Sequence, residues 1–476
     1  MSHAEPGEAR THPSRTLLIL LLAAMAYSLA QTVIVPALPA IQEQTGTSEA
    51  TVTWLLTAFL LVSSVSTPLI GRLGDMYGKE RMLLLALVGF GIGSVVCAVG
   101  THSIGLLIAG RVIQGVGGAI FPLSFGIVRD EFPPERVAAS IGTLSSVFGI
   151  GGGAGLVLAG VCVDHLSVAW LFWISVVVTA IAAWATWRFV PESPVRVDAR
   201  IDWGGGALLS LSLAAVLLGV SQGPDWGWLS GGVVGLIVAG LVLLGVFVAY
   251  ERRVTDPMVD MALMARRPVW SPNLAEFAVG FAMFGSYILI PQLVEAPDST
   301  PYGFDLSATG AGLVMLPSAV VMLVAGPLAG RMGNAFGSRL PLALGSSLCV
   351  VAYVGLAFAH AHVWTIALAG AVLGAGIAFA FAAMANLVVA AVDQTQTGIA
   401  TGINTIVRNV GGAVGGQISA SLLASQVLAS GYPAEDGYTI AFAISGVAAV
   451  VALAATALIP RPVPRDRHGR PTAAAA

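Results

Sequence analysis

The chain has very few charged residues and only one lysine. Asp, Glu, Lys and Arg make up 10% of its 476 residues, and 56% of the residues are hydrophobic. Soluble domains carry roughly 25% charged residues, so this composition excludes an ordinary soluble protein. The apolar residues form runs of about 18 or more, long enough to cross a bilayer as helices and too long for barrel strands. We therefore predict an all-α polytopic membrane protein.

The sequence also lacks the motifs of an ATP-driven pump or an enzyme. Its lysine, Lys79, is followed by Glu80, so no GxxxxGK[ST] phosphate loop exists. There is no metal-ligand cluster, HExxH helix or GxSxG sequence. We expect no enzyme activity, no cofactor and no metal, and scattered basic residues predict no nucleic-acid partner. The cysteines lie within apolar runs without paired spacing, which predicts buried free thiols; they are Cys97, Cys162 and Cys349.

Apolar runs predict about fourteen spanning helices. The first six are expected at 16–38, 51–69, 82–99, 104–128, 138–163 and 168–190. Two follow at 203–220 and 231–248, and six more at 273–294, 308–329, 340–359, 363–389, 397–428 and 438–459. The first run exceeds the length of a signal-peptide core, so we expect it to be a span. The domains predicted are a six-helix bundle at 16–190, an inserted helix pair with linkers at 191–268 and a second six-helix bundle at 269–460, between tails at 1–15 and 461–476.

Basic and acidic residues alternate from loop to loop along this prediction. Loops expected inside carry the basic residues Arg72, Lys79, Arg81, Arg129, Arg136, Arg188, Arg196, Arg252, Arg266, Arg331 and Arg339. Loops expected outside carry the acidic residues Glu43, Asp164, Asp225, Glu295, Asp298, Asp305, Glu435 and Asp436. Because positive residues are retained in the cytoplasm, both termini are predicted to be cytoplasmic. The tail 461–476 is predicted to be disordered.

A motif occurs twice, each time at the end of an apolar run. It reads PLIGRLGDMYGKER at 68–81 and PLAGRMGNAFGSR at 327–339. Proline and glycine interrupt helices, so we expect each helix to stop at the proline and a tight basic turn to begin there. The two copies predict a duplicated bundle.

The first copy resembles the signature loop of the major facilitator superfamily. LLIAGRVIQGVGGA at 106–119 resembles the fourth-helix motif of that superfamily. The glycines of the fifth run resemble the glycine-rich motif of its antiporters: Gly149, Gly153, Gly155 and Gly160. With about fourteen spans, the chain resembles the drug/proton antiporter branch. This resemblance implies a major-facilitator-type fold, in which two bundles of inverted repeats move against each other and the inserted pair packs at their periphery.

The sequence departs from the pattern of that branch at three positions. Ala30 stands where relatives often carry an aspartate, which favours neutral or anionic cargo over lipophilic cations. Leu156 stands where the antiporter motif usually has proline, so the fifth helix is expected to be straight. Asn334 matches Asp75 in the second copy, so the two copies are electrostatically unequal.

The signature loop is expected to act as a gate. A carboxylate at Asp75 can face the positive N-terminal end of a helix in the other bundle. The resemblance implies a gating role for this residue together with Gly71 and Gly78, and a contact between Arg81 and Asp130 that closes the inner side. The alternative is a solvated charge cluster that only orients insertion.

Charged residues inside the spans are candidates for proton coupling. The resemblance assigns this role to Arg111, which can shift the pKa of a nearby acid or hold a water chain. Glu276 and Arg408 enter from the same side at similar depths, so we expect them to pair and Glu276 to titrate. The alternatives are a structural salt bridge for Arg111 and snorkelling to the surface for Glu276.

Substrate selection is expected to depend on a central cavity. Neutral polar and aromatic residues of the spans are candidate lining residues, although such residues more often serve packing; they are Gln31, Thr32, Gln114, Phe277, Tyr287, Gln292 and Asn404. The glycine clusters are alternatively explained as close helix crossings.

These observations favour a proton-coupled exporter of small hydrophobic drugs or antibiotics, working by alternating access in a bacterial inner membrane. No N-x-[ST] site lies in an outer loop, in agreement with a prokaryotic membrane. Its partners are then the small hydrophobic substrate, protons and the lipid bilayer. An uncoupled facilitator or proton symporter is one alternative, and a non-transporting receptor or scaffold is another.

Overall fold

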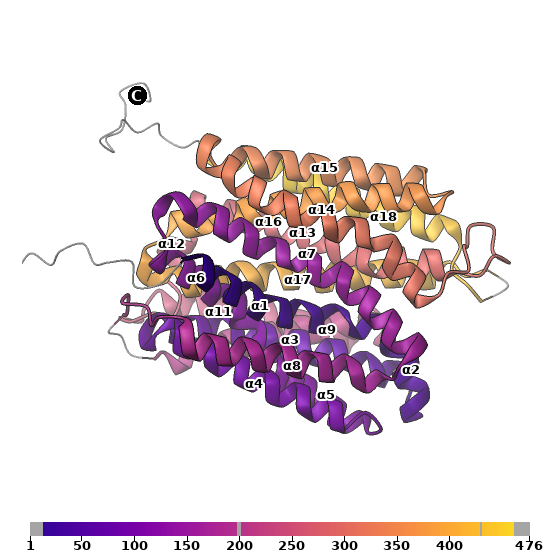
Figure 1. The fold of residues 1–476 in the computed structure, drawn as a ribbon, viewed down its shortest axis with the longest axis horizontal. Helices are drawn as coiled ribbons and strands as arrows, with labels where there is room; N and C mark the ends of the chain where they lie inside the picture. The colour runs from indigo at the N-terminus through magenta and orange to yellow at the C-terminus, as the bar shows by residue number, and fades with distance from the viewer. Residues whose placement is uncertain (1–12, 198–200, 429–430, 461–476) are drawn as a thin grey trace, which may run out of the picture.

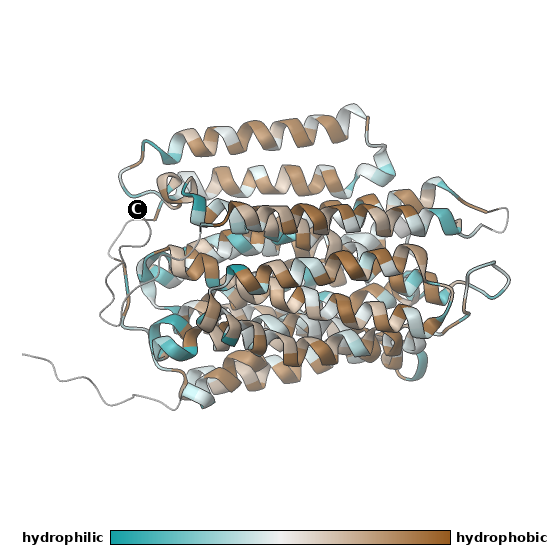
Figure 2. Cartoon of the chain, turned by 90° about the horizontal axis from the view of Figure 1, so that it is seen from above, coloured by the Kyte–Doolittle hydropathy of each residue, from teal (hydrophilic) through white to brown (hydrophobic). Residues whose placement is uncertain are grey.

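The computed structural model describes residues 13–197, 201–428 and 431–460, and these form a body of long helices lying side by side (Figure 1). Apart from an isolated bridge between Val427 and Pro433, the described residues contain no β-structure. Apolar residues cover the flanks of the helices and polar residues gather towards their ends (Figure 2), as a bilayer requires. The predicted tail 461–476 and most of the predicted tail 1–15 lie outside the described residues.

The helices follow the order expected for two bundles and an inserted pair. The first bundle contains α1 (Pro13–Thr32), α2 (Ile34–Thr45), α3 (Glu49–Tyr77), α4 (Lys79–Val99), α5 (Ile104–Gln114), η1 (Gly115–Ala119), α6 (Ile120–Glu131), α7 (Pro134–His165) and α8 (Val168–Phe189). The inserted segment contains α9 (Trp203–Ser221), α10 (Gly223–Trp226), α11 (Gly231–Glu251) and α12 (Met261–Met264). The second bundle contains α13 (Arg267–Glu295), α14 (Ala308–Phe336), α15 (Arg339–Phe358), α16 (Val363–Ala391), η2 (Gln394–Gln396), α17 (Thr397–Ser425) and α18 (Glu435–Leu458).

Among the described residues, 13 helical segments are long and apolar enough to cross a membrane. The remaining predicted span corresponds to α17, which has 29 residues but a more polar sequence with Thr, Asn, Arg and Gly in its interior. Most of these polar residues are buried, so α17 avoids lipid by packing between other helices. The all-α fold class with about fourteen spans is confirmed.

Several helix ends differ from the prediction. The first expected span is two helices, α1 and α2, that meet at Val33; Pro36 follows closely and has no N–H to donate. The fourth span contains a 3₁₀ segment, η1, at the sequence GVGGA. The cysteines are buried and free, as expected.

The prolines of the repeated motif do not end their helices, which corrects the sequence prediction. α3 continues through Pro68 to Tyr77, and α14 continues through Pro327 to Phe336. Proline costs a helix one hydrogen bond, which membrane helices tolerate when neighbouring groups compensate. The turns lie instead at Gly78 and Gly337, whose φ angles of 113° and 82° are open to glycine.

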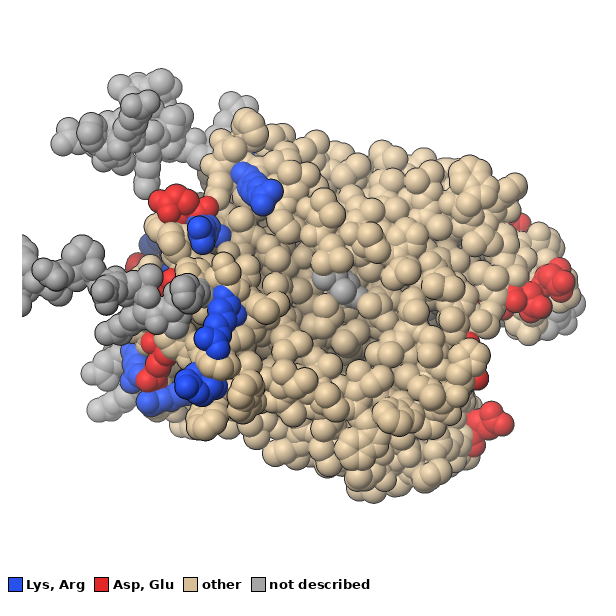
Figure 3. Space-filling view, in the orientation of Figure 1, with Lys and Arg blue, Asp and Glu red and all other residues tan. Residues whose placement is uncertain are grey.

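The two ends of the molecule differ in charge. Figure 3 shows lysine and arginine gathered at one end and only acidic groups at the other end of the visible face. We call the first the basic end; it contains the start of α4, the end of α6 and the start of α13. The acidic end contains the end of α7, α10, the end of α13 and the start of α18.

Glycines bring α7 and α14 into contact along their whole length. At the acidic end, a Cβ on Gly160 would lie 2.5 Å from the backbone nitrogen of Thr309, and nearer the middle Gly153 packs on Ala319 and Gly149 on Met322. Three of the four glycines that resemble the antiporter motif therefore lie at this crossing, whereas Gly155 packs against Thr32 of α1. α7 runs unbroken through Leu156 for 32 residues, as the absence of proline predicts.

Candidate functional site

A cavity lies between the two bundles in the half of the molecule nearer the acidic end. It admits water-sized molecules over a volume of about 120 Å³. Among the described residues, no charged side chain lines it, and most of its lining is apolar or aromatic. The lining residues are Ser28, Gln31, Thr32, Val35, Thr53, Leu56, Thr57, Phe59, Leu60, Leu61, Phe148, Leu156, Leu217, Ser221, Met283, Phe284, Tyr287, Ile288, Gly412, Ala413, Gly416 and Gln417.

Three of the predicted cavity residues line this space: Gln31, Thr32 and Tyr287. The Thr32 hydroxyl donates to the Gly151 carbonyl at 2.8 Å. The side-chain nitrogen of Gln31 is buried and has no hydrogen-bond partner among the described residues. Gln31 therefore has an unpartnered donor group in the wall of the cavity.

The other four predicted residues lie outside the cavity. Gln114 is fully buried and bonds Arg111 and Ser94. Asn404 donates to Asn273 at 2.9 Å, and neither it nor Phe277 lines the cavity. Gln292 is exposed near the acidic end of α13. The polarity of a residue does not reveal which way its side chain points around the helix, and these four side chains do not face the cavity.

Glu276 and Arg408 form the expected buried ion pair, with 3.4 Å between Glu276 Oε1 and Arg408 Nη1. Their side chains are 1% and 5% exposed, so neither snorkels to the surface. The second carboxylate oxygen and two guanidinium nitrogens have no hydrogen-bond partner in the part of the chain that the structure describes. The pair is therefore only partly satisfied, and a buried pair in that condition gains little stability from its charges.

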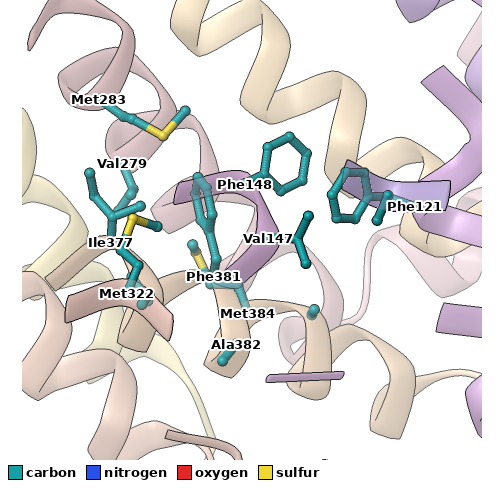
Figure 4. Packing of buried hydrophobic residues seen from close by; sticks show 14 of the residues in the cluster. Phe121, Val147, Phe148, Val279, Met283, Met322, Ile377, Phe381, Ala382 and Met384 are labelled. Atoms are coloured by element: carbon teal, nitrogen blue, oxygen red, sulfur yellow. The ribbon is translucent and has the colours of Figure 1, made fainter. Parts of the chain in front are cut away.

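An aromatic wall separates this ion pair from the cavity. The Arg408 guanidinium carbon lies 4.0 Å from the ring centre of Phe148 on α7 and 5.1 Å from that of Phe381 on α16. Phe148 lines the cavity and stacks on Phe121 with 3.9 Å between ring centres. Figure 4 shows these rings meeting from both bundles. A ligand touching Phe148 would therefore contact a ring that carries Arg408 as a cation–π partner.

Arg111 is buried and has no carboxylate partner within residues 13–197, 201–428 and 431–460. It donates to the Leu55 carbonyl at 2.8 Å, the Ala30 carbonyl at 3.0 Å and the Gln114 side-chain oxygen at 2.9 Å. Its guanidinium carbon lies 4.0 Å above the ring of Phe59, another lining residue. Ala30 thus meets Arg111 through its backbone carbonyl.

At the basic end, the signature loop joins the end of α3 to the start of α17. Asp75 accepts hydrogen bonds from the backbone nitrogens of Gly398 and Ile399, both at 3.1 Å. This is the predicted contact of a carboxylate with a helix N-terminus of the other bundle. Gly71 permits the approach, because a Cβ there would lie 2.8 Å from the Gly398 carbonyl oxygen.

Asp130 pairs with Lys79 and not with Arg81, which corrects the predicted contact. Lys79 Nζ lies 2.7 Å from Asp130 and 3.4 Å from Asp75, and all three side chains are fully buried. Arg81 instead pairs with Glu192 at 2.7 Å and is largely exposed. Gly78 turns the chain so that Lys79 begins α4 facing α3; Arg81, two residues later, is about 200° further round the helix.

Arg129 makes a second contact across the basic end, which no sequence motif indicates. It donates to the carbonyls of Val392 at 2.7 Å and Asp393 at 3.1 Å, and to the Thr397 hydroxyl at 2.8 Å. It lies next to Asp130 on α6, in a segment rich in charge. Its contact with the start of α17 depends on tertiary structure that no local pattern reveals.

The second motif copy makes a weaker contact, between α14 and α7. Asn334 donates to the Glu135 carbonyl at 2.7 Å, but its side chain is exposed. Asp75, in contrast, accepts two bonds in a buried site. The predicted inequality of the two copies is visible in these contacts.

The fold and the cavity define a multi-pass membrane protein with two helical bundles around a shared central space. The family model described as Major Facilitator Superfamily matches residues 20–416 and 273–475. The chain belongs to the major facilitator superfamily.

Two of its relatives carry the names of drug resistance and export proteins. The chain is 28% identical over 288 residues to multidrug resistance protein 3 of Bacillus subtilis, covering 60% of this chain and 54% of that protein. It is 27% identical over 409 residues to the tetracenomycin C resistance and export protein of Streptomyces glaucescens, covering 84% and 74%. It thus spans about half the length of the first of these relatives and about three quarters of the second.

A solved structure with a similar fold is the human organic anion transporter MFSD10 (TETRAN). Its TM-score is 0.68 at 17% identity, with 95% of this chain and 100% of that chain covered. At this identity the likeness concerns the fold alone.

Proposed function

We propose that this protein is a proton-coupled exporter of small hydrophobic compounds that works by alternating access. The observation that carries the proposal is the buried Glu276–Arg408 pair, which lies behind Phe148 in the wall of the cavity. A carboxylate that exchanges protons there changes the charge beside Arg408, and hence the interactions of the ring that faces the ligand. Proton binding and cargo binding are thereby coupled through one side chain. No covalent chemistry is required.

Alternating access requires that one end be closed while the other is open. Asp75 and Arg129 join the bundles at the basic end, whereas the cavity lies towards the acidic end. We propose that the basic end faces the cytoplasm, because cytoplasmic loops are enriched in Lys and Arg. The structure then corresponds to a state closed towards the cytoplasm, both termini are cytoplasmic, and the membrane is a bacterial inner membrane. The domain limits stay as predicted, at 16–190, 191–268 and 269–460.

The cargo we propose is neutral or anionic. Within the described residues the cavity has no acidic lining residue, and its buried neighbours Arg111 and Arg408 are cationic. A lipophilic cation would find no counter-charge in this wall. The names of the relatives make tetracenomycin C a reasonable first compound to test.

The deciding experiment measures internal pH and cargo together in proteoliposomes. With the unmodified protein, addition of tetracenomycin C to vesicles under a pH gradient should release protons, and ethidium, a lipophilic cation, should not. Glu276→Gln should abolish proton movement and uphill transport, because the amide cannot titrate. Glu295→Gln, an exposed change on the same helix, serves as the matched control and should leave both activities intact.

Two outcomes would contradict the proposal. If Glu276→Gln retains proton-driven export, another group carries the proton. If the unmodified protein moves cargo down its gradient with no proton flux, the protein is an uncoupled facilitator.

A further inference from the structure

We infer that the inserted helix α9 is a third wall of the cargo cavity, which contacts cargo through Leu217 and Ser221 and closes the cavity against lipid. This inference rests on the proposed export function. The resemblance to the antiporter branch implies that the inserted pair packs at the periphery of the bundles. The structure instead puts residues from both ends of α9 against functional parts of the molecule.

Along its first half, α9 covers the seam between α3 and α17. Leu209 and Leu213 belong to one buried cluster with Ile399 and Ile406 of α17, and Leu69 of α3 packs against it. This is the seam that Asp75 closes at the basic end. α9 therefore contacts both bundles at once.

Along its second half, α9 lies over the cavity. Leu217 and Ser221 are lining residues, and Leu217 is only 4% exposed. Here α3 contributes Thr57 to the lining and α17 contributes Gln417. An apolar helix in this place separates the cargo from the surrounding acyl chains.

One hydrogen bond ties the inserted segment to each bundle near the acidic end. Ser221 and Thr57 of α3 have their hydroxyl oxygens 2.7 Å apart. Trp228, after α10, donates to the Ser421 hydroxyl of α17 at 3.0 Å. Hydroxyl and indole groups in a membrane interior need such partners, so these bonds fix α9 across the space between the bundles.

The partner helix α11 completes the arrangement on the lipid side. It packs on α9 where a Cβ on Gly240 would lie 2.9 Å from the Ser212 carbonyl oxygen. Its outer residues are largely exposed, including Val238 and Val242. A hydrophobic cargo released from this cavity is thereby directed to the aqueous phase beyond the acidic end, because the side route into the bilayer is covered.

The first test compares two tryptophan substitutions on the same helix. Leu217→Trp places an indole in the cavity wall, whereas Leu211→Trp places one at a site that is 58% exposed towards lipid. For tetracenomycin C transport in proteoliposomes, Leu217→Trp should raise KM at least tenfold with little change in kcat. Leu211→Trp should leave KM within twofold. An unchanged KM for correctly folded Leu217→Trp would overturn the inference.

The second test does not depend on transport. Cysteine is introduced as Leu217→Cys or Leu211→Cys, with a low background because the native Cys97, Cys162 and Cys349 are buried. A charged, membrane-impermeant methanethiosulfonate should label Leu217→Cys at least tenfold faster than Leu211→Cys, and tetracenomycin C should slow the labelling. Equal slow labelling at both sites would show that α9 does not face an aqueous cavity. If tetracenomycin C is not transported yet the labelling rates differ, the export proposal fails, but the inference that α9 lines an aqueous cavity is supported.

Discussion

Replacing Asp75 by asparagine should weaken the closure of the basic end. The carboxylate accepts two hydrogen bonds, at 3.1 Å each, from the first amides of α17. Hydrogen bonds to a charged group contribute roughly 1.5–3 kcal/mol each, and a neutral bond roughly 0.5–1.5 kcal/mol. The substituted amide would keep at most one neutral bond, since its nitrogen cannot accept. The loss is therefore at least about 1.5 kcal/mol, or about a tenfold shift towards the state open at the basic end.

The shift can be measured as a distance distribution between two spin labels. Tyr77 at the end of α3 and Gln394 before α17 are exposed and flank the contact, so Tyr77→Cys and Gln394→Cys provide the labels. In the unmodified background the short distance of the closed state should dominate. Asp75→Asn should add a longer component, and Asp225→Asn, an exposed change at the acidic end, should not.

An unchanged distribution in Asp75→Asn would refute this reasoning. The contact would then be a charge cluster that orients the loop without controlling the closed state. Loss of transport with an unchanged distribution would have the same meaning, because the defect would not act through the gate.

Two further predictions concern stability. Lys79→Met leaves the buried carboxylates of Asp130 and Asp75 without their shared cation and should cost about 3–5 kcal/mol in unfolding free energy. The pair Lys79→Met/Asp130→Leu should recover only part of the loss, because Asp75 still lacks Lys79. An unfolding midpoint in the single variant equal to that of the parent would contradict this prediction. Gly160→Val drives a side chain into the backbone of Thr309 and should cost about 1–3 kcal/mol, while Gly235→Val, with nothing within 4 Å, should be neutral. Thermal unfolding in detergent measures both pairs, and equal midpoints for the two glycine variants would disprove the close crossing.

Hydropathy predicts most of the spans because unsatisfied backbone and charge are costly in lipid. Hydropathy does not predict where the helices end, because a helix can continue into water, where polar groups are not penalised. α3 runs past the predicted end at Leu69 for this reason, ending only where Gly78 adopts a positive φ. α17 falls below the hydropathy of its neighbours since other helices, rather than lipid, surround its polar residues.

The charged part of the site was partly predictable from sequence. Buried charged residues need partners, and Glu276 and Arg408 lie at similar depths along their helices. The sequence therefore predicted that they pair. Whether Lys79 or Arg81 pairs with Asp130 depends on the direction in which each side chain points around α4, and the motif does not reveal this direction. Phe148 and Leu217 were not predicted, because an apolar residue in a cavity wall has the same local pattern as one in a packed core.

The contact between α7 and α14 is continuous from Gly160 at one end to Asn334 at the other, and Asp164 bonds the start of α14 through the amide and hydroxyl of Thr309. In the proposed cycle the two ends of this line must part in turn, because one end of the molecule opens while the other stays closed. Opening the basic end separates Asn334 from Glu135 as well as Asp75 from α17, and it leaves Asp164 on Thr309. The glycine contacts in the middle of the line, such as Gly153 on Ala319, then lie nearest the axis of rocking, where displacement is smallest.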